Sequence, residues 1–142
     1  MQTMTQLLAV KGAHVWSVPA DATVFEALQV MADKDIGALV VMERGRPVGV
    51  VSERDYTRKV ILKGRSSYDT PVRTIMTTAF ATAPPEMSVD TCMTLMTMHR
   101  TRHVVIMEGA GIRGIVSIGD LVKATINEQQ FTISQLERYI RS

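Results

Sequence analysis

The sequence is poor in cysteine, in aromatic residues and in net charge. Its 142 residues include a single cysteine, Cys92, so no disulfide can form within the chain, which suits a reducing compartment. Aromatic residues make up 5% of the chain, and 16 Lys and Arg against 14 Asp and Glu give a formal net charge of +2. Such a small excess creates no strong field for a polyanion, and no apolar run approaches the length of a membrane-spanning helix. These absences argue against nucleic acid and membranes as partners.

The beginning of the chain is not expected to be a secretory signal. It has no charged segment of the secretory type, and its apolar run extends only from Leu7 to Val10. The chain is 46% hydrophobic and 21% charged, which is the composition of a folded domain rather than of a disordered segment. We therefore predict a soluble, cytoplasmic protein of about one domain in length.

The most informative feature is an internal repeat with an offset of 65 residues. Residues 19–57 and 84–122 align without a gap, and ten of the 39 pairs are identical. Unrelated segments match at roughly one pair in fifteen. Both copies end on the same pattern, which is Gly49-Val50-Val51-Ser52-Glu53-Arg54-Asp55 in the first and Gly114-Ile115-Val116-Ser117-Ile118-Gly119-Asp120 in the second. The chain is therefore a duplication.

Each copy predicts the order strand, helix, strand, strand, helix. Thr23 and Ser88 are good N-cap residues, and apolar residues follow each of them at helical spacing. A second helix is expected to begin at Ser52 and at Ser117. The predicted strands are 15–18, 38–42 and 48–51 in the first copy and 80–83, 104–107 and 112–116 in the second. The predicted fold class is therefore α/β (α+β), with two β-α-β-β-α repeats.

The segments outside the aligned core extend this organisation. The leaders of the two copies align at the same offset, with Thr5 on Thr70 and Val10 on Ile75. After Glu128, apolar residues at roughly helical intervals predict an accessory helix that packs on the module or on a partner subunit. The expected boundaries are 5–63 for repeat 1, 64–71 for a polar linker, 72–126 for repeat 2 and 127–142 for the helical tail.

The duplicated pattern resembles a tandem pair of CBS domains, also called a Bateman module. The two copies of Gly-h-h-Ser-x-x-Asp, where h is apolar, carry the resemblance, together with Val72-Arg73-Thr74-Ile75-Met76-Thr77 and Ile36-Gly37-Ala38-Leu39-Val40-Val41. It covers roughly Leu7 to Ile126 and is closest to stand-alone proteins that consist of one CBS pair. It implies a pseudo-twofold unit, commonly a homodimer, with clefts between the repeats for AMP, ATP, NAD or S-adenosylmethionine.

The resemblance also implies which residues bind such a ligand. A carboxylate in the first turn of a helix can accept hydrogen bonds from both ribose hydroxyls, while the helix start faces a phosphate. Apolar edges beside it can enclose a planar base. The expected ribose residues are Ser52, Asp55, Ser117 and Asp120; the base residues are Ile36, Gly37, Ala38, Val51, Thr101 and Val116; and the phosphate residues are Arg54, Arg102 and His103.

A second interpretation of the Ser-x-x-Asp pattern needs no ligand. Ser and Asp at this spacing resemble a capping box, which satisfies the unpaired N–H groups of a helix start. Arg54 points the other way, because a cation in the first turn opposes the helix dipole unless an anion is nearby. Charge is shared unevenly, since Arg54 is replaced by Gly119 in the second copy, which has instead Arg102 and His103 at its middle strand. We therefore expect the two clefts to differ.

Other features are expected to be structural. His99 and His103 have no further His or Cys partner, so no metal site is predicted. Cys92 aligns with Ala27 on the apolar face of a helix and is expected to be a small buried side chain. A basic cluster follows the first copy, at Arg58, Lys59, Lys63 and Arg65, and is typical of a solvated helix face.

No arrangement of residues typical of catalysis is present, and no catalytic cofactor is expected. We therefore predict a non-enzymatic regulatory module that binds an adenine nucleotide and signals to an effector protein in trans. The alternative is a ligand-independent, dimeric interaction or stress-response protein in which the clefts are vestigial.

Overall fold

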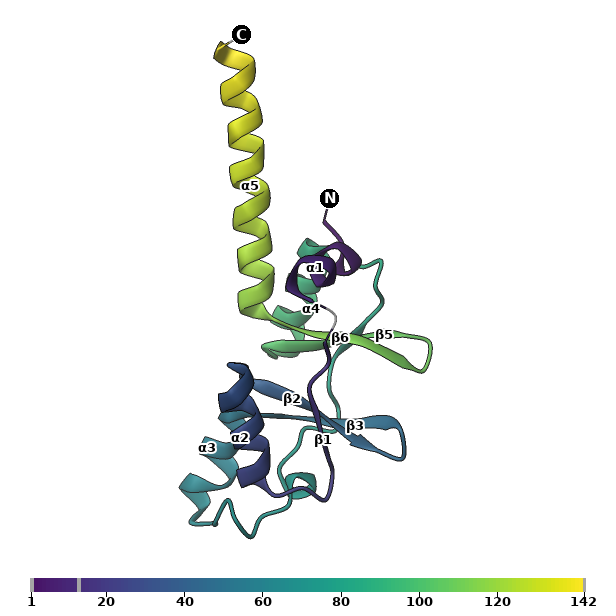
Figure 1. Cartoon of the computed structure of the whole chain (residues 1–142), viewed down its shortest axis with the longest axis vertical. Coiled ribbons are helices and arrows are strands. Elements are labelled where there is room, and N and C mark those ends of the chain that lie inside the picture. Colours follow the sequence, from purple (N-terminus) through teal and green to yellow (C-terminus); the bar gives the residue numbers. More distant parts are fainter. Residues whose placement is uncertain (1, 13, 142) are drawn as a thin grey trace. The chain divides into compact units, whose positions relative to one another are not determined.

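The computed structural model describes residues 2–12 and 14–141. Its helices are α1 (Met4–Lys11), α2 (Val24–Lys34), α3 (Glu53–Lys59), α4 (Val89–His99) and α5 (Ile118–Arg141), with single 3-10 turns η1 (Ile61–Lys63) and η2 (Val72–Thr74). Its strands are β1 (Ser17–Pro19), β2 (Ala38–Glu43), β3 (Arg46–Ser52), β4 (Thr82–Ala83), β5 (His103–Glu108) and β6 (Gly111–Ser117). They form two three-stranded sheets, ordered β1-β2-β3 and β4-β5-β6 (Figure 1). The predicted α/β class is confirmed.

The duplication seen in the sequence is a duplication of structure. Helix α2 and strands β2 and β3 recur as α4, β5 and β6, and every boundary is displaced by the same 65 residues. Strand β1 pairs parallel with β2, and β4 pairs parallel with β5, while β2 and β3 are antiparallel. Between β2 and β3, Arg44 and Gly45 both have positive φ (52° and 76°), as a two-residue hairpin turn of type I′ requires.

The two equivalent helices end in the same way. Asp35 after α2 and Arg100 after α4 both adopt the left-handed conformation, with φ of 53° and 51°. The N–H of the next residue then donates to a carbonyl five residues earlier, from Ile36 to Met31 (3.0 Å) and from Thr101 to Met96 (3.1 Å). This is a Schellman ending, a position that usually favours glycine. It turns the backbone at the end of each helix directly into the middle strand of the following sheet.

The chain forms two compact units that do not follow the order of the sequence. Unit 1 comprises Met1–Ala13, Ala81–Glu108 and Arg113–Ser142, and unit 2 comprises His14–Phe80 and Gly109–Ile112. The leader of the first repeat therefore belongs to the unit built mainly on the second repeat. The expected boundaries of 5–63 and 72–126 describe the sequence repeats, and the compact units cut across them.

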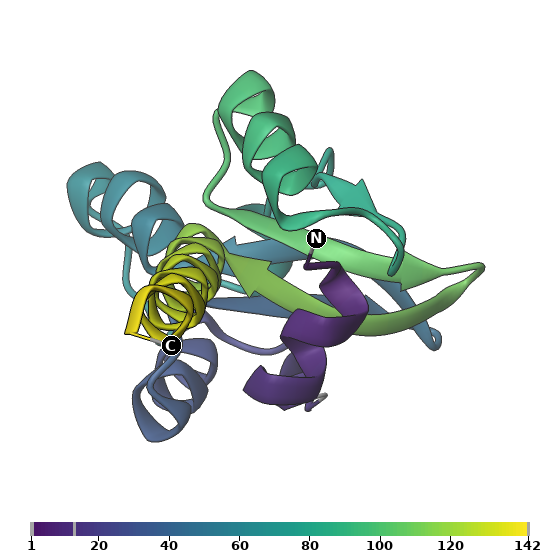
Figure 2. The same ribbon diagram turned by 90° about the horizontal axis from the view of Figure 1, so that it is seen from above.

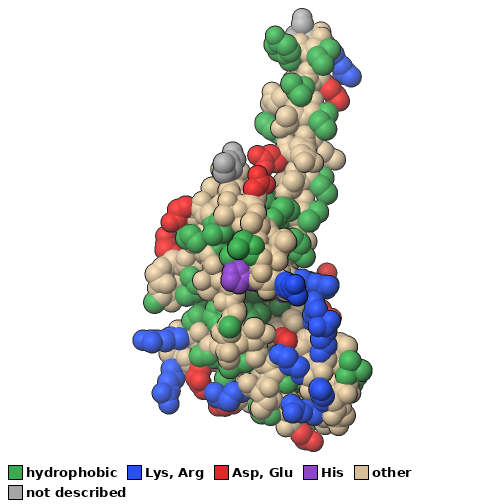
Figure 3. All heavy atoms as spheres, turned by 180° about the vertical axis from the view of Figure 1, so that it is seen from behind, with side chains coloured by type: hydrophobic (Ala, Val, Ile, Leu, Met, Phe, Trp, Pro, Cys, Tyr) green, Lys and Arg blue, Asp and Glu red, His purple; other side chains and the backbone are tan. Residues whose placement is uncertain are grey.

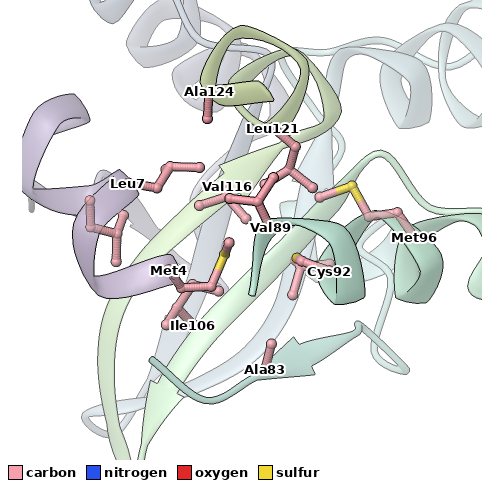
Figure 4. Packing of buried hydrophobic residues seen from close by; sticks show 12 residues of the cluster. Met4, Leu7, Ala83, Val89, Cys92, Met96, Ile106, Val116, Leu121 and Ala124 are labelled. Carbon is pink, nitrogen blue, oxygen red and sulfur yellow. The ribbon is translucent and has the colours of Figure 1, made fainter. Parts of the chain in front are cut away.

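Unit 1 has a core that α1, α4, α5 and the second sheet share (Figure 4). Met4 and Leu7 of α1 point into it, toward Ile106, Val116 and Leu121. Hydrogen bonds hold α1 there, because the N–H of Met4 donates to the Met87 carbonyl at 2.9 Å. Cys92 lies in this core and is fully buried, as predicted, and burial raises the pKa of its thiol.

The core of unit 2 is completed by residues that precede the second aligned copy, 84–122, in the sequence. Val72 of η2 and Ile75 are buried with Val24, Leu39 and Val41 in its core. The N–H of Val72 donates to the Ala22 carbonyl at 2.8 Å, which is the counterpart of the bond between Met4 and Met87. Each unit therefore takes its closing segment from the leader of the other repeat.

The predicted alignment of the leaders is wrong by three residues. Met87 and Ala22 are equivalent at the offset of 65, so their donors Met4 and Val72 are equivalent at an offset of 68. Burial agrees, because Val10 is 82% exposed whereas Ile75, with which it was aligned, is 1% exposed. The offset of 65 residues could not be extended to the leaders because the first leader is a full helix and the second is one 3-10 turn.

The surroundings of two glycines support the same offset of 68 residues between the leaders. A Cβ on Gly49 would lie 2.6 Å from the Met76 sulfur, and one on the equivalent Gly114 would lie 2.7 Å from a Leu8 methyl. Met76 and Leu8 are again 68 residues apart. Both sheets therefore use a glycine to let the leader side chain approach closely.

The predicted accessory helix is not separate from the last helix of the second repeat. One helix, α5, runs without a break for 24 residues, because no glycine or proline interrupts it after Gly119. Figure 2 looks along it from above and shows a single straight axis. Leu121 and Ala124 are its buried residues, and every side chain from Ile126 to Arg141 is exposed. The tail adds no side chain to the buried core of unit 1.

Candidate functional site

The first candidate site lies where β3 turns into α3. Ser52 is the N-cap, with extended φ and ψ of −130° and 164°, and its Oγ accepts from the Asp55 N–H at 3.2 Å. In return the Asp55 Oδ2 accepts from the Ser52 N–H at 2.9 Å and from the Ser52 hydroxyl at 3.0 Å. The ammonium of Lys59, one turn further along α3, pairs with the other carboxylate oxygen, Oδ1, at 3.2 Å.

The second candidate site repeats this arrangement where β6 turns into α5. The Asp120 Oδ2 accepts from the Ser117 N–H at 2.8 Å, and the Ser117 Oγ accepts from the Asp120 N–H at 3.1 Å. Both capping boxes are therefore formed, as the second interpretation predicted. A capping box orients each carboxylate at a helix start and does not by itself exclude a ligand.

Lys11 distinguishes the second site from the first, and the sequence did not single it out. Its ammonium, at the end of α1, lies 2.6 Å from the Asp120 Oδ2 and also donates to the Ile115 carbonyl at 2.7 Å. No sequence signal marked this pair, because the two residues are 109 positions apart. The pair exists because α1 packs into unit 1.

The Asp120 carboxyl is tuned by opposing effects. Burial raises its pKa, but the hydrogen bond and charge of Lys11 and the hydrogen bonds of the Ser117 cap outweigh burial, so the pKa lies below its usual value. Asp120 is therefore ionised at neutral pH. An ionised carboxylate is an acceptor only, which is the form that binds hydroxyl groups.

The residues expected to enclose a base divide into two groups. The side chains of Ala38, Val51 and Val116 are buried at 3%, 1% and 0% exposure, so they are not accessible to a base in this structure. Ile36 and Gly37 in the first copy and Thr101 in the second are half-buried. Three of the six lie within strands and three lie just before one, and the sequence could not tell which side chains turn into the cores.

The residues expected at a phosphate are mostly at the surface. Arg54 and Arg102 are exposed, and His103 is half-buried at the start of β5. The Thr101 hydroxyl donates to the His103 carbonyl at 3.0 Å and accepts from the His103 N–H at 3.4 Å, which stabilises the entry to that strand.

The helix starts offer fewer free N–H groups than the pattern alone suggested. In α3 the first N–H, of Glu53, donates to the Gly37 carbonyl at 3.1 Å, and the third donates to Ser52. The equivalent donors and acceptors in α5 are Ile118 with Arg102 and Asp120 with Ser117. Two of the first three N–H groups of each helix are therefore already paired, and a phosphate would depend more on cationic side chains.

Neither a metal site nor a membrane-spanning helix is found in the part of the chain that the structure describes. Among residues 2–12 and 14–141, no three His, Cys, Asp or Glu side chains gather as metal ligands do. No helix among them is long and apolar enough to cross a membrane.

Comparison with protein families gives the identity of the repeat. The CBS domain model matches residues 10–61 and 72–127, one match on each copy. The chain belongs to the CBS-domain family. The resemblance inferred from the sequence is therefore confirmed, and the chain carries a tandem CBS pair.

Individual CBS proteins resemble the chain along most of its length. The mitochondrial CBS domain-containing protein CBSX3 of Arabidopsis thaliana is 40% identical over 135 residues, which cover 92% of the chain and 65% of that relative. A solved protein with CBS domains from Burkholderia ambifaria is 44% identical, with a TM-score of 0.86 over 93% of the chain and 99% of its own. A CBS domain protein from Pyrobaculum aerophilum, solved in complex with AMP, is 30% identical, with a TM-score of 0.74 over 83% of the chain and 88% of its own.

Proposed function

We propose that this CBS pair is a non-enzymatic regulatory module that binds an adenine nucleotide at its two strand-to-helix junctions. The observation that carries the proposal is the twin Ser–Asp geometry, in which each capping box presents an oriented carboxylate at a helix start. The Pyrobaculum relative in complex with AMP supports the class of ligand. AMP, ATP, NAD and S-adenosylmethionine all carry the adenosine that such a site would bind.

Each proposed contact follows from the position of a side chain. Asp55 and Asp120 accept hydrogen bonds from the ribose hydroxyls, and Ser52 and Ser117 hold them in place. The base lies against the half-buried residues, and the phosphates meet two exposed arginines and the half-buried His103. The base residues are Ile36, Gly37 and Thr101, and the phosphate residues are Arg54, Arg102 and His103.

The two sites differ in ways that support unequal affinities. Lys59 holds Asp55 through the oxygen that the cap leaves open, whereas Lys11 shares the capped oxygen of Asp120. Ribose at Asp55 therefore competes with Lys59 for Oδ1, whereas the cap and Lys11 both use Oδ2 of Asp120 and leave its Oδ1 to the ribose. We propose that the site of Asp120 is the tighter one.

Signalling requires that the nucleotide bind one conformation better than another. The proposed module is a cytoplasmic homodimer, and an effector protein in trans binds the nucleotide-bound form preferentially. The nucleotide is a regulatory ligand in this scheme and not a catalytic cofactor.

A thermal-shift panel with AMP, ATP, NAD, NADH and S-adenosylmethionine tests the proposal. A ligand at 100 times its dissociation constant adds about 2.7 kcal/mol to the stability of the folded state. For a chain of this size the unfolding midpoint should rise by roughly 5–11 °C. If none of the five shifts the midpoint at millimolar concentration, the proposal fails. The alternative, a ligand-independent interaction protein, would then be favoured, because the capping boxes already pair the helix starts with the chain's own side chains.

Variants localise the binding. Asp55→Asn and Asp120→Asn keep an acceptor for the cap and remove the charge, and we expect Asp120→Asn to weaken AMP binding at least tenfold and more than Asp55→Asn does. Ser88→Ala removes the cap of α4, which lies outside both sites, and is the matched control for a simple loss of stability. Equal losses from the two Asp variants would contradict the inequality of the sites. Equal loss from Ser88→Ala would contradict the sites themselves.

A further inference from the structure

One face of α5 carries a stripe of large aliphatic side chains that remain exposed. Figure 3 shows hydrophobic side chains along this helix. The stripe residues are between 38% and 79% exposed, and they are Ile118, Val122, Ile126, Ile133, Leu136 and Ile140. Isolated apolar residues are normal on a surface, but a continuous stripe indicates an interaction surface.

The spacing of the stripe is that of a helix pair. From Val122 to Ile140 the stripe positions recur at alternating intervals of four and three residues, and the polar Gln129 takes one of them. In heptad terms, Ile126, Ile133 and Ile140 occupy a positions, while Val122 and Leu136 occupy d positions. A β-branched residue at a with Leu at d is typical of two-stranded coiled coils.

The stripe is a different face from the one that α5 buries in its own unit. At 3.6 residues per turn, Leu121 and Ala124 point roughly a third of a turn away from it. Phe131, which is 65% exposed, lies on the side of those buried residues and not on the stripe. The stripe is therefore not a continuation of the core contact.

The flanking residues argue for a protein partner rather than a lipid surface. Amphipathic helices that lie on membranes carry Lys and Arg along their polar face. Between Ala124 and Glu137 α5 has no Lys or Arg, and its polar side chains are Thr, Asn, Gln, Ser and Glu. The stripe from Val122 to Ile140 is about 27 Å long.

We propose that this stripe binds the same stripe of a second copy of the chain, with the two α5 helices antiparallel. Charge decides the direction. Lys123 and Glu137 flank the stripe on the same side, 14 residues or about 21 Å apart, which is too far for a pair within one helix. In an antiparallel pair Lys123 lies beside Glu137 of the other copy, twice. In a parallel pair their neighbours would be Ile118 and Thr132.

The proposal deepens the proposed homodimer by naming its surface, and it does not depend on nucleotide binding. Half of the stripe, from Ile133 to Ile140, lies beyond the segments that match the CBS domain model. The pairing surface therefore begins within the second CBS segment and continues beyond it. The stripe spans less than three heptads, so the association should be reversible and dependent on concentration.

Sedimentation velocity over a concentration series tests the surface. The double variant I133K/L136K places two cations in the centre of the stripe, and we expect its dimer dissociation constant to rise at least a hundredfold. Phe131→Lys is the matched control, because it removes an equally exposed apolar side chain off the stripe, and it should change the constant by less than threefold. A monomeric wild type at high protein concentration, or equal effects of the two variants, would overturn the proposal.

Charge reversal tests the direction. Lys123→Glu and Glu137→Lys should each weaken the dimer by about tenfold, and the double reversal should restore it. Failure of the double variant to recover would overturn the antiparallel pairing. Thermal shifts with AMP on every variant separate the proposal of nucleotide binding from the proposal of α5 pairing. A variant that loses the dimer and still binds AMP has lost only the contact between the α5 helices. A dimer that survives I133K/L136K would leave the homodimer standing and exclude this surface.

Discussion

Two lysines hold the two candidate aspartates, and they do so in unlike ways. Lys59 comes from the same helix as Asp55, four residues later, a pairing that helix geometry alone allows. Lys11 reaches Asp120 from α1 and also bonds a carbonyl of β6, so it ties three elements of unit 1 together. At the scale of single residues, the duplicated sites have therefore diverged in what surrounds them rather than in the Ser–Asp pattern itself.

The Lys11 pair predicts a pH dependence. The pKa of Asp120 is depressed in the folded state, so the pair contributes stability above the unfolded pKa of about 4 and loses it as the pH falls through the folded pKa. Lys11→Met should therefore lower the free energy of unfolding at pH 7, by at most about 1 kcal/mol because both side chains are partly exposed. The difference from wild type should shrink as the pH falls. Urea unfolding between pH 7 and pH 2 measures both.

Asp120→Asn provides the control for this prediction. In that background Lys11→Met should show no pH-dependent effect, because the titrating group is gone. A carboxyl titration followed by NMR should also move the pKa of Asp120 upward in Lys11→Met. An unchanged titration would contradict the assigned cause.

At the scale of elements, the endings of α2 and α4 show how the repeat turns helix into strand. Asp35 and Arg100 hold the left-handed conformation that lets Ile36 and Thr101 close the last helical turn. Neither residue is glycine, so both copies retain a backbone strain of roughly 1–2 kcal/mol. The strain is tolerated because the ending directs the chain into the buried middle strand.

These endings predict stabilising substitutions. Asp35→Gly and Arg100→Gly remove the left-handed strain and should each raise the free energy of unfolding by up to about 1 kcal/mol, after the greater unfolded-state entropy of glycine is counted. The midpoint of urea unfolding measures the gain. Asp35→Ala and Arg100→Ala are the controls, because they remove the same side chains and leave the strain. Glycine variants no more stable than the alanine variants would refute this account.

At the scale of the whole molecule, the leaders are crossed between the units. Met4 precedes the first aligned copy, 19–57, and is fully buried in unit 1, while Ile75 precedes the second, 84–122, and is buried in unit 2. The linker and the leader are therefore structural parts of the fold, and neither repeat has a closed core from its own residues alone.

The crossing predicts where each core variant acts. Met4→Ala should cost about 2–5 kcal/mol and lower amide hydrogen-exchange protection in α4 and β5, with less effect on β2. Ile75→Ala should have a similar cost but lower the protection of β2, with less effect on α4 and β5. Ile75→Val, which costs about 0.5–1.5 kcal/mol, keeps the test available if the larger deletion prevents folding. Loss of protection confined to the sequence neighbours of each residue would contradict the crossed arrangement.

Most of the element order could be predicted because it depends on local chemistry. The caps at Thr23 and Ser88, the turn at Arg44 and Gly45, and the repeat offset all involve residues close in sequence. The leader alignment failed because Val10 is apolar, as Ile75 is, and periodicity cannot tell a surface apolar residue from a core one. The prediction of a separate helix in the tail failed for a related reason, because the end of a sequence repeat need not be the end of a helix.

The sequence by itself determined the duplication, the family and the two Ser–Asp pairs, because these are encoded by residue type at fixed short spacing. Only the tertiary structure decided which leader closes which core, that Lys11 holds Asp120, and that Val51 and Val116 turn inward. The physical reason is distance along the chain. Contacts between residues a hundred positions apart follow from the packing of whole elements, and packing selects among many apolar segments that look equivalent in a single sequence.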